Sequence, residues 1–276
     1  KAALLEVRGS RVRPGLDDKV LAAWNGLAIR AFAEAGAALE DERLLHLAAG
    51  CARFIMENLV VDGTLMRSWR DGRTSVPGFL DDHAGLAVGL FTLFAATGEV
   101  RWYHEAMGRV GRLDEFANPD GGFYSTSATG EQLVKRPADF TDNPLPSGNA
   151  LAAEALMMAS LYTGGRKERE ASTAALGAVG LLAERYSSMV GHHLAVAHAW
   201  LDPREVAIVG DDWRELARVY WKRYRPGIVL AVSRAGSEEV PLLAERWDGT
   251  TRAFVCRGFI CDLPTTDPAV LAAQLA

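Results

Sequence analysis

Carboxylate pairs occur at positions where acid–base chemistry could use them. Asp17-Asp18 and Asp81-Asp82 each precede an alanine- and leucine-rich stretch, and Asp142 and Asn149 lie near the start of a third. Glycoside hydrolysis needs two carboxyl groups, one to protonate the leaving oxygen and one to act as base or nucleophile. Crowded carboxylates also raise one another's pKa, which suits a general acid. These residues are therefore candidates for catalysis.

The same residues have a structural interpretation, because Asp and Asn are favoured at helix N-caps, where they accept unpaired amide hydrogens. For any single residue this cap interpretation is favoured. Both members of an Asp-Asp pair cannot cap the same helix, so one member of each pair is free for chemistry. We therefore take Asp17 or Asp18, together with Asp82, as the best acid–base candidates, and keep Asp81 beside them.

Aromatic and amide side chains near these carboxylates could hold a ring-shaped polar ligand. Trp24 offers a flat platform, and Asn25 can donate and accept hydrogen bonds. Alternatively, Trp24 belongs to the core and Gly26 permits a close helix contact; the sequence leaves both interpretations open. Further binding candidates are Trp69, Tyr124, Asp142, Ser147 and Asn149.

Histidines add a possible base. His83 follows Asp82 directly, and its titration range suits proton transfer, although a capping or surface role is favoured. His192, His193 and His198 form a small cluster without a cysteine or paired carboxylate at metal-ligand spacing, so we expect a structural or surface role. The sequence thus predicts no metal and no cofactor.

The three cysteines exclude a disulfide scaffold. Cys51 lies on an apolar helical face and is expected in the core. Cys256 and Cys261 could pair if the chain turns between them, but two reduced thiols are favoured. Low cysteine use and the lack of a signal peptide predict a cytoplasmic protein.

Three similar segments position the candidate residues. Apolar residues recur at helical spacing over about the first 200 residues. Short polar segments that open a helix, here called openers, recur about 65 residues apart: Leu16–Asp18, Leu80–Asp82 and Pro146–Asn149. Each opener leads a helix that we expect to end at Gly36, Gly98 or Gly164 and to be followed by a second helix. In the first unit this second helix is predicted over 42–59, and a short hairpin strand over 64–69. Residues 1–200 are therefore predicted to form three helical hairpins.

The composition changes after about residue 200. Two apolar runs, 205–210 and 228–232, flank a helix expected to begin after Asp211-Asp212. Such a strand–helix–strand unit is normally a parallel, right-handed crossover. A third strand is expected over 252–256, and a last helix from Thr266-Asp267-Pro268. The fold class is therefore mainly α, with a small α/β C-terminal unit over 201–276.

Composition excludes several classes of protein. The chain has 276 residues, of which 49% are hydrophobic and 24% charged, so whole-chain disorder is excluded. A net charge of −5 argues against nucleic-acid and anionic-membrane partners. No apolar run approaches the roughly 20 residues that span a bilayer. A dinucleotide fingerprint is also absent.

Several longer strings resemble the barrel domain of the spermatogenesis-associated protein 20 family, which includes the bacterial YyaL-like proteins. The resemblance runs through the whole chain in order. The strings that carry it are Arg13-Pro14 with Leu16–Leu21, Trp24–Leu27, Phe79–Asp82, Asp120–Tyr124, Arg136-Pro137, Pro146–Asn149, and Val255-Cys256 through Pro268.

The resemblance implies an (α/α)6 toroid that follows a thioredoxin-like domain and is similar to six-hairpin glycosidases and N-acylglucosamine 2-epimerases. In such a toroid the starts of the inner helices line one mouth, so Asp17, Asp18, Asp81, Asp82, Asp142 and Asn149 would surround one cavity. His83 departs from the family pattern, where an aromatic residue, usually Tyr, is expected. We expect this chain to lack the thioredoxin-like domain and the first hairpins of the ring.

Two functions follow as expectations. The first is a carbohydrate-active protein, acting as a glycoside hydrolase or an epimerase-type isomerase on a small sugar. The second is a non-catalytic binding or scaffold domain that works with the thioredoxin-like domain. A deep cavity with two carboxyl groups favours the first, and a cavity plugged by Trp24 favours the second. An incomplete ring should also expose apolar helix faces, so we expect contact with the missing half of the protein, or aggregation.

Overall fold

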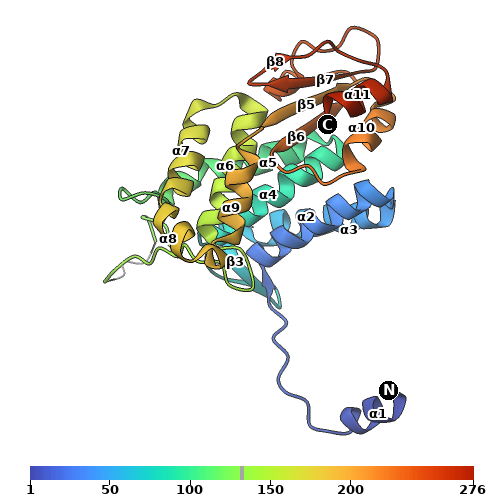
Figure 1. Cartoon of the computed structure of the whole chain (residues 1–276). Helices are drawn as coiled ribbons and strands as arrows, with labels where there is room; N and C mark the ends of the chain where they lie inside the picture. Colours follow the sequence, from blue (N-terminus) through green and yellow to red (C-terminus); the bar gives the residue numbers. More distant parts are fainter. Residues whose placement is uncertain (131–133) are drawn as a thin grey trace.

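The computed structural model describes residues 1–130 and 134–276. In these ranges three helical hairpins stand side by side, as the repeat predicts (Figure 1). Each pairs an inner helix with an outer one: α2 (Ala22–Leu39) with α3 (Glu42–Asn58), α4 (Leu80–Thr97) with α5 (Val100–Gly111), and α6 (Gly148–Thr163) with α7 (Arg166–Gly177).

Glycines end two of the inner helices. Gly98 and Gly164 adopt left-handed conformations with φ of 71° and 72°, which a residue without Cβ adopts at no steric cost. The expectation that Gly36 ends the first inner helix is wrong, because α2 continues to Leu39 and is capped by Glu40. A Cβ at Gly36 would lie 2.8 Å from the Leu45 side chain, so Gly36 serves close packing instead.

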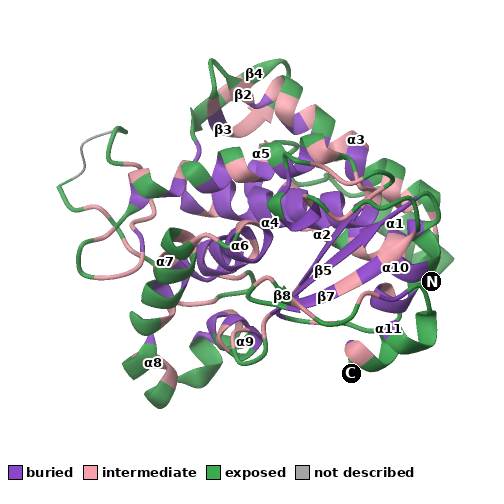
Figure 2. Ribbon diagram, turned by 90° about the horizontal axis from the view of Figure 1, so that it is seen from above, coloured by how far each residue is buried: buried purple, intermediate pink, exposed green. Residues whose placement is uncertain are grey.

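The inner helix α4 is the centre of the core. Nearly all of its residues are buried, and it lies between α2 and α6 (Figure 2). Glycines let α2 and α4 approach closely. A Cβ on Gly26 would lie 2.6 Å from the backbone of Gly85, and one on Gly89 would lie 2.3 Å from the carbonyl oxygen of Gly26. The sequence interpretation of Gly26 as a close-contact residue is therefore confirmed.

A small sheet closes the end of the array where the inner helices begin. Its strands are β1 (Val20–Leu21), β2 (Val60–Val61), β3 (Thr64–Arg70) and β4 (Arg73–Pro77). The hairpin strand predicted over 64–69 is β3, which pairs antiparallel with β4. Asp71 and Gly72 form the turn with φ of 49° and 76°, the geometry of a two-residue hairpin loop.

The C-terminal unit carries a second sheet with the order β6-β5-β7-β8 in the described chain. Strands β5 (Arg204–Val209) and β6 (Ile228–Ser233) are parallel and joined through α10 (Trp213–Trp221), which confirms the parallel pairing that was predicted. Strands β7 (Arg252–Arg257) and β8 (Ile260–Cys261) are antiparallel, and α11 (Pro268–Gln274) begins at the Asp267 cap as expected.

Successive side chains of β5 point to opposite faces of this sheet, and each face packs against a different layer. Val206 and Ile208 pack with α10 and α11, whereas Ala207 and Val209 pack with the helical array. This period of two is what a strand buried on both faces requires. The sheet therefore joins the helical array through a shared core.

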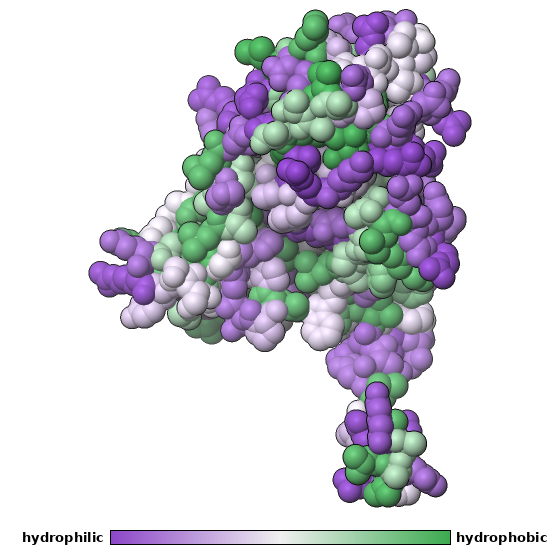
Figure 3. Space-filling model, turned by 45° about the vertical axis from the view of Figure 1, so that its right-hand side comes forward, coloured by the Kyte–Doolittle hydropathy of each residue, from purple (hydrophilic) through white to green (hydrophobic). Residues whose placement is uncertain are grey.

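The remaining elements are short. They are α1 (Ala2–Gly9), α8 (Gly180–Arg185), α9 (Gly191–Ala199) and the 3₁₀ turns η1 (Leu113–Phe116), η2 (Ser187–Met189) and η3 (Pro241–Leu243). Residues 1–19 are exposed, and Figure 3 shows α1 at the end of an arm that projects from the body. None of the helices in the described residues is long and apolar enough to cross a membrane.

The expectation of two reduced thiols in the C-terminal unit is wrong. Cys256 on β7 and Cys261 on β8 are direct partners in the strand register and form a disulfide. The chain turns between the two cysteines, which is the condition that the alternative prediction of a disulfide required. Cys51 stays free and half-buried, and its Sγ donates to Oδ1 of Asn25 at 3.2 Å.

Replacing Gly26 with Ala should destabilise the protein by about 1–3 kcal/mol, because the new methyl group would force α2 and α4 apart. Gly50→Ala on α3 is the control, since a Cβ there would make only an ordinary contact, 3.8 Å from the Arg53 side chain. The control should be neutral, or stabilising by up to about 1 kcal/mol. Urea unfolding measures both, and equal midpoints for the two variants would contradict the close contact.

Candidate functional site

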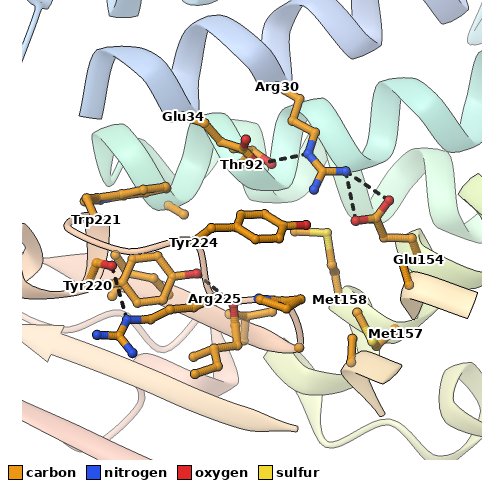
Figure 4. A pocket seen from close by; sticks show the side chains of 18 of the residues that line it. Arg30, Glu34, Thr92, Glu154, Met157, Met158, Tyr220, Trp221, Tyr224 and Arg225 are labelled. Carbon is orange, nitrogen blue, oxygen red and sulfur yellow. Dashed lines mark hydrogen bonds and ion pairs between the residues drawn. The ribbon is translucent and has the colours of Figure 1, made fainter. Parts of the chain in front are cut away.

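A cavity of about 520 Å³ lies between the helical array and the C-terminal unit. Helices α2, α4 and α6 form one wall, and α9 with the segment from Tyr220 to Leu230 forms the other (Figure 4). This volume falls in the range of small-molecule sites. The cavity is therefore the main candidate for ligand binding.

A network of charged side chains crosses one wall of the cavity. Nη1 of Arg30 on α2 donates to both carboxylate oxygens of Glu154 on α6, at 2.9 and 3.0 Å. Nε of Arg30 donates to Glu34 at 2.9 Å, one helical turn further along α2. On the other side, Nε2 of His192 at the start of α9 lies 2.8 Å from Oε2 of Glu154. The network thus links three helices through one carboxylate.

Glu154 is buried, yet it is held in the ionised form. Burial alone would raise its pKa, but the hydrogen bond from His192 and the charge of Arg30 outweigh burial and lower the pKa below its usual range. The ionised carboxylate accepts the Nε2 proton of His192. In the neutral form of His192 this hydrogen bond places the proton on Nε2 and leaves a lone pair on Nδ1.

Aromatic side chains form the opposite wall. The Tyr220 and Trp221 rings pack edge-to-face with centroids 4.9 Å apart, and the Tyr220 hydroxyl donates to the Ile228 carbonyl at 2.7 Å. Nε of Arg225 donates to the Tyr220 carbonyl at 3.3 Å. Figure 4 shows the ring of Tyr224 directed toward Arg30 and Met158. The cavity thus offers apolar rings facing a charged wall, an arrangement that suits a polar ring-shaped ligand.

The carboxylates proposed from the sequence lie elsewhere, beside strand β3. Nη1 of Arg67 on β3 contacts Asp81 at 3.0 Å and Asp82 at 2.8 Å. Asp82 is fully buried, and its oxygens also accept the backbone amides of Ala23 at 3.0 Å and Phe79 at 2.9 Å. Asp82 therefore binds one amide at the start of α2 and one at the start of α4. It lies at the third position of α4 and Phe79 is the N-cap, so the expectation that Asp82 is the N-cap is wrong, although its side chain does stabilise the helix start.

Burial raises the pKa of Asp82 to about 6, and the charge of Asp81 adds to the increase. Arg67 and the two backbone amides offset part of it. A raised pKa is the property that a general acid needs. Because the oxygens of Asp82 are occupied by structural donors, its catalytic role stays a prediction.

Asp17 and Asp18 do not cap the first inner helix, so that interpretation is wrong. They lie in the exposed segment before β1, and α2 begins at Ala22 with Leu21 as N-cap. Asp17 pairs with Lys19 at 3.3 Å, and Asp18 pairs with Nε of Arg70 on β3 at 2.7 Å. Strand β3 therefore brings Asp18 to the same sheet as the Asp81-Asp82 pair.

His83 is neither a cap nor a surface residue, contrary to the favoured interpretation. It is 5% exposed and its ring lies 5.5 Å from that of Phe116. Burial, together with the charges of Arg109 and Arg112, lowers its pKa to about 3. His83 is therefore neutral at physiological pH and packed inside the protein.

The candidates at the third opener bind the backbone of neighbouring loops. Ser147 caps α6 by accepting from the amide of Ala150 at 3.2 Å. Asp142 accepts from the amides of Ser147 at 2.8 Å and His192 at 2.7 Å, so it holds α9 beside α6. Asn149 is buried and pairs with both backbone groups of Phe123, at 2.7 and 2.9 Å.

The aromatic candidates occupy different positions. Trp24 is 61% exposed, so the interpretation as a core residue is wrong. Asn25 donates to the carbonyl of Leu21, the N-cap of its own helix, at 2.8 Å. Trp69 packs edge-to-face on Phe54, with centroids 5.1 Å apart, and Tyr124 stacks under the guanidinium of Arg136 at 4.2 Å. Their roles in ligand binding stay predictions.

Sequence reasoning missed the residues of the cavity wall. Glu154 interrupts an alanine- and leucine-rich helix, and a charged residue in a buried helix requires a partner. Arg30 and Glu34 stand four residues apart on α2, which is typical of an ion pair. His192 belongs to the histidine cluster, but nothing in its spacing indicates Glu154. In the part of the chain that the structure describes, no group of three potential ligands could hold a metal ion.

Comparison with known proteins confirms the family resemblance. The chain is 29% identical to human spermatogenesis-associated protein 20 over 97% of its own length, and 29% identical to the mouse protein over the same share. It spans 37% of the length of these relatives. No protein-family model matches the chain.

A solved structure shares the fold. The GH76 alpha-mannanase of Bacteroides thetaiotaomicron superposes on 95% of this chain and 70% of its own, with a TM-score of 0.52 and 11% sequence identity. The helical hairpins are therefore part of an (α/α)6 toroid, as expected. At this identity the likeness establishes the fold alone.

The raised pKa of Asp82 predicts how its contribution to stability depends on pH. A carboxyl group whose folded pKa exceeds its unfolded value stabilises the protein below the unfolded pKa, and this contribution is lost as pH rises through the folded pKa. The stability of the wild type relative to Asp82→Asn should therefore fall between about pH 4 and pH 6. Asp81→Asn should move the fall to lower pH, since the Asp81 charge raises the pKa of Asp82. A pH-independent difference in urea unfolding would contradict the assignment.

Proposed function

Because the chain resembles spermatogenesis-associated protein 20 along nearly its whole length and shares a toroid fold with a glycoside hydrolase, we propose that it is a carbohydrate-active protein that binds a small sugar in the cavity beside Glu154. The observation that carries the proposal is the juxtaposition of the Glu154–His192 pair with the aromatic wall of this cavity. Sugar rings present an apolar face to aromatic side chains and hydroxyl groups to charged ones.

The reaction that fits this wall best is proton transfer at a sugar carbon, of the epimerase type. Glu154 orients His192 through Nε2, and Nδ1 takes the proton from the carbon next to the carbonyl of the open-chain sugar. The C–H electron pair moves toward the carbonyl oxygen to give an enediol, and return of a proton to the same carbon restores the carbonyl. Arg30 keeps Glu154 ionised, which stabilises the imidazolium form after the proton has moved. The half-buried position of His192 suits a base that must reach both the cavity and water.

Hydrolysis is less well supported. A general acid for a glycosidic oxygen needs a raised pKa, whereas the pKa of Glu154 is lowered. Asp82 has a raised pKa, but backbone amides and Arg67 occupy its carboxylate. The scaffold alternative keeps one supporting observation, namely that the polar groups of Glu154 are already partnered inside the protein.

A panel of small sugars, including mannose and N-acylated hexosamines, tests binding by thermal shift. A ligand at a hundredfold excess over its Kd should stabilise the protein by about 2.7 kcal/mol. When the protein is incubated in D₂O with a sugar that binds, one carbon-bound hydrogen of the sugar should be replaced by deuterium. Mass spectrometry of the sugar measures this exchange. Binding without exchange would favour the scaffold function, and failure of all sugars to bind would overturn the proposal.

His192→Gln should abolish exchange, because the amide cannot accept the proton, while binding changes by less than about tenfold. His46→Gln is the matched control, since His46 is an exposed histidine on α3 outside the cavity. The control should retain both binding and exchange. Equal exchange in the two variants would remove His192 from the reaction.

A further inference from the structure

We propose that the Cys256–Cys261 pair is a thiol–disulfide exchange site, open to attack by a dithiol reductant at Cys261. The pair lies on the β7–β8 hairpin, far from the cavity in the sheet order, since β8 is the edge strand and β6 lines the cavity. The inference is therefore independent of the proposed sugar site. Figure 1 shows this hairpin at the margin of the molecule.

The two sulfurs differ in access. Cys256 is 1% exposed and lies inside the sheet, whereas Cys261 is half-buried on the edge strand next to Ile260, which is 82% exposed. An incoming thiolate therefore reaches Sγ of Cys261 first. In thiol–disulfide exchange the sulfur that is attacked forms the mixed disulfide, so the leaving group here is Cys256.

A cation is held against the accessible sulfur. Nη1 of Arg246 lies 3.2 Å from Sγ of Cys261. Its Nε donates to the Leu242 carbonyl at 2.7 Å, and its guanidinium stacks on the ring of Phe254 at 4.9 Å, so the side chain is fixed in place. A neighbouring guanidinium favours the thiolate form of a cysteine. Arg246 thus stabilises the Cys261 thiolate that reduction releases.

The hairpin keeps its shape by other means than the disulfide. The strands β7 and β8 pair through the backbone, and the Glu205 carboxylate accepts the amides of Gly258 at 3.2 Å and Phe259 at 3.4 Å in the turn. The disulfide closes a loop of five residues in sequence separation, and a short loop restricts the unfolded chain less than a long one. The pair can therefore open without loss of the hairpin.

Reduction of the disulfide by a dithiol takes two exchange steps. The first thiolate of the dithiol attacks Sγ of Cys261, the bond between the two cysteines breaks, and Cys256 leaves as a thiolate that takes a proton. The second thiol of the reductant loses its proton, attacks the mixed disulfide and releases the Cys261 thiolate beside Arg246. The dithiol is oxidised to a disulfide, and the protein gains two thiols.

Maleimide labelling of the folded Cys51→Ser protein tests the pair, because this variant removes the free thiol. We expect no adduct before treatment with dithiothreitol and one adduct, at Cys261, after it, by intact mass, because Cys256 stays buried in the folded protein. Adducts without reductant would show that no disulfide forms. Adducts that appear only in denaturant would show a closed structural bridge. Either result overturns the proposal.

The role of Arg246 is tested in the Cys51→Ser, Cys256→Ser background, where Cys261 is the remaining thiol. Arg246→Gln should slow alkylation of Cys261 by iodoacetamide at pH 7 about threefold or more, since less thiolate forms. Arg246→Lys should restore part of the rate. Arg257→Gln, which removes an exposed charge from the same hairpin, is the control. Equal slowing by both glutamine variants, with circular dichroism showing that each is folded, would overturn the role of Arg246.

Discussion

The ion pair between Arg30 and Glu154 is the interaction on which the arrangement of the cavity depends. It joins the first and third inner helices across 124 positions of the sequence and extends to α9 through His192. A buried carboxylate without partners would be strongly unfavourable, so Arg30 and His192 must both approach Glu154. The positions of α2, α6 and α9 around the cavity follow from this requirement.

Close helix contacts allow the ion pair to form. Gly26, Gly85 and Gly89 bring α2 against α4, and α4 lies between α2 and α6. Asp82 fixes the starts of α2 and α4 together, because it accepts an amide from each. The C-terminal sheet then covers the inner helices with the small side chains of Ala207 and Ala231, and leaves space beside Tyr220 and Trp221.

The sequence predicted the hairpins and the C-terminal crossover, because helical spacing, terminal glycines and apolar strands are local signals. It also identified Asp82, Ser147 and Asn149 as caps or candidates, and all three bind backbone amides or carbonyls. It could not identify the cavity, because Arg30, Glu154 and His192 come from three helices far apart in the chain. Their meeting depends on tertiary packing, which periodicity alone does not describe. The disulfide depends on tertiary structure in the same way, since the register of β7 and β8 places Cys256 opposite Cys261.

A double-mutant cycle on Arg30 and Glu154 tests the central claim most directly. The free energy of unfolding is measured for wild type, Arg30→Met, Glu154→Leu and the double variant. Each single change removes one partner of a buried charge, while Glu154 keeps His192 and Arg30 keeps Glu34. Each should cost about 3 kcal/mol, and the double variant should cost at least about 2 kcal/mol less than the sum. Costs that add to within about 0.5 kcal/mol would show that the pair does not hold α2 and α6 together.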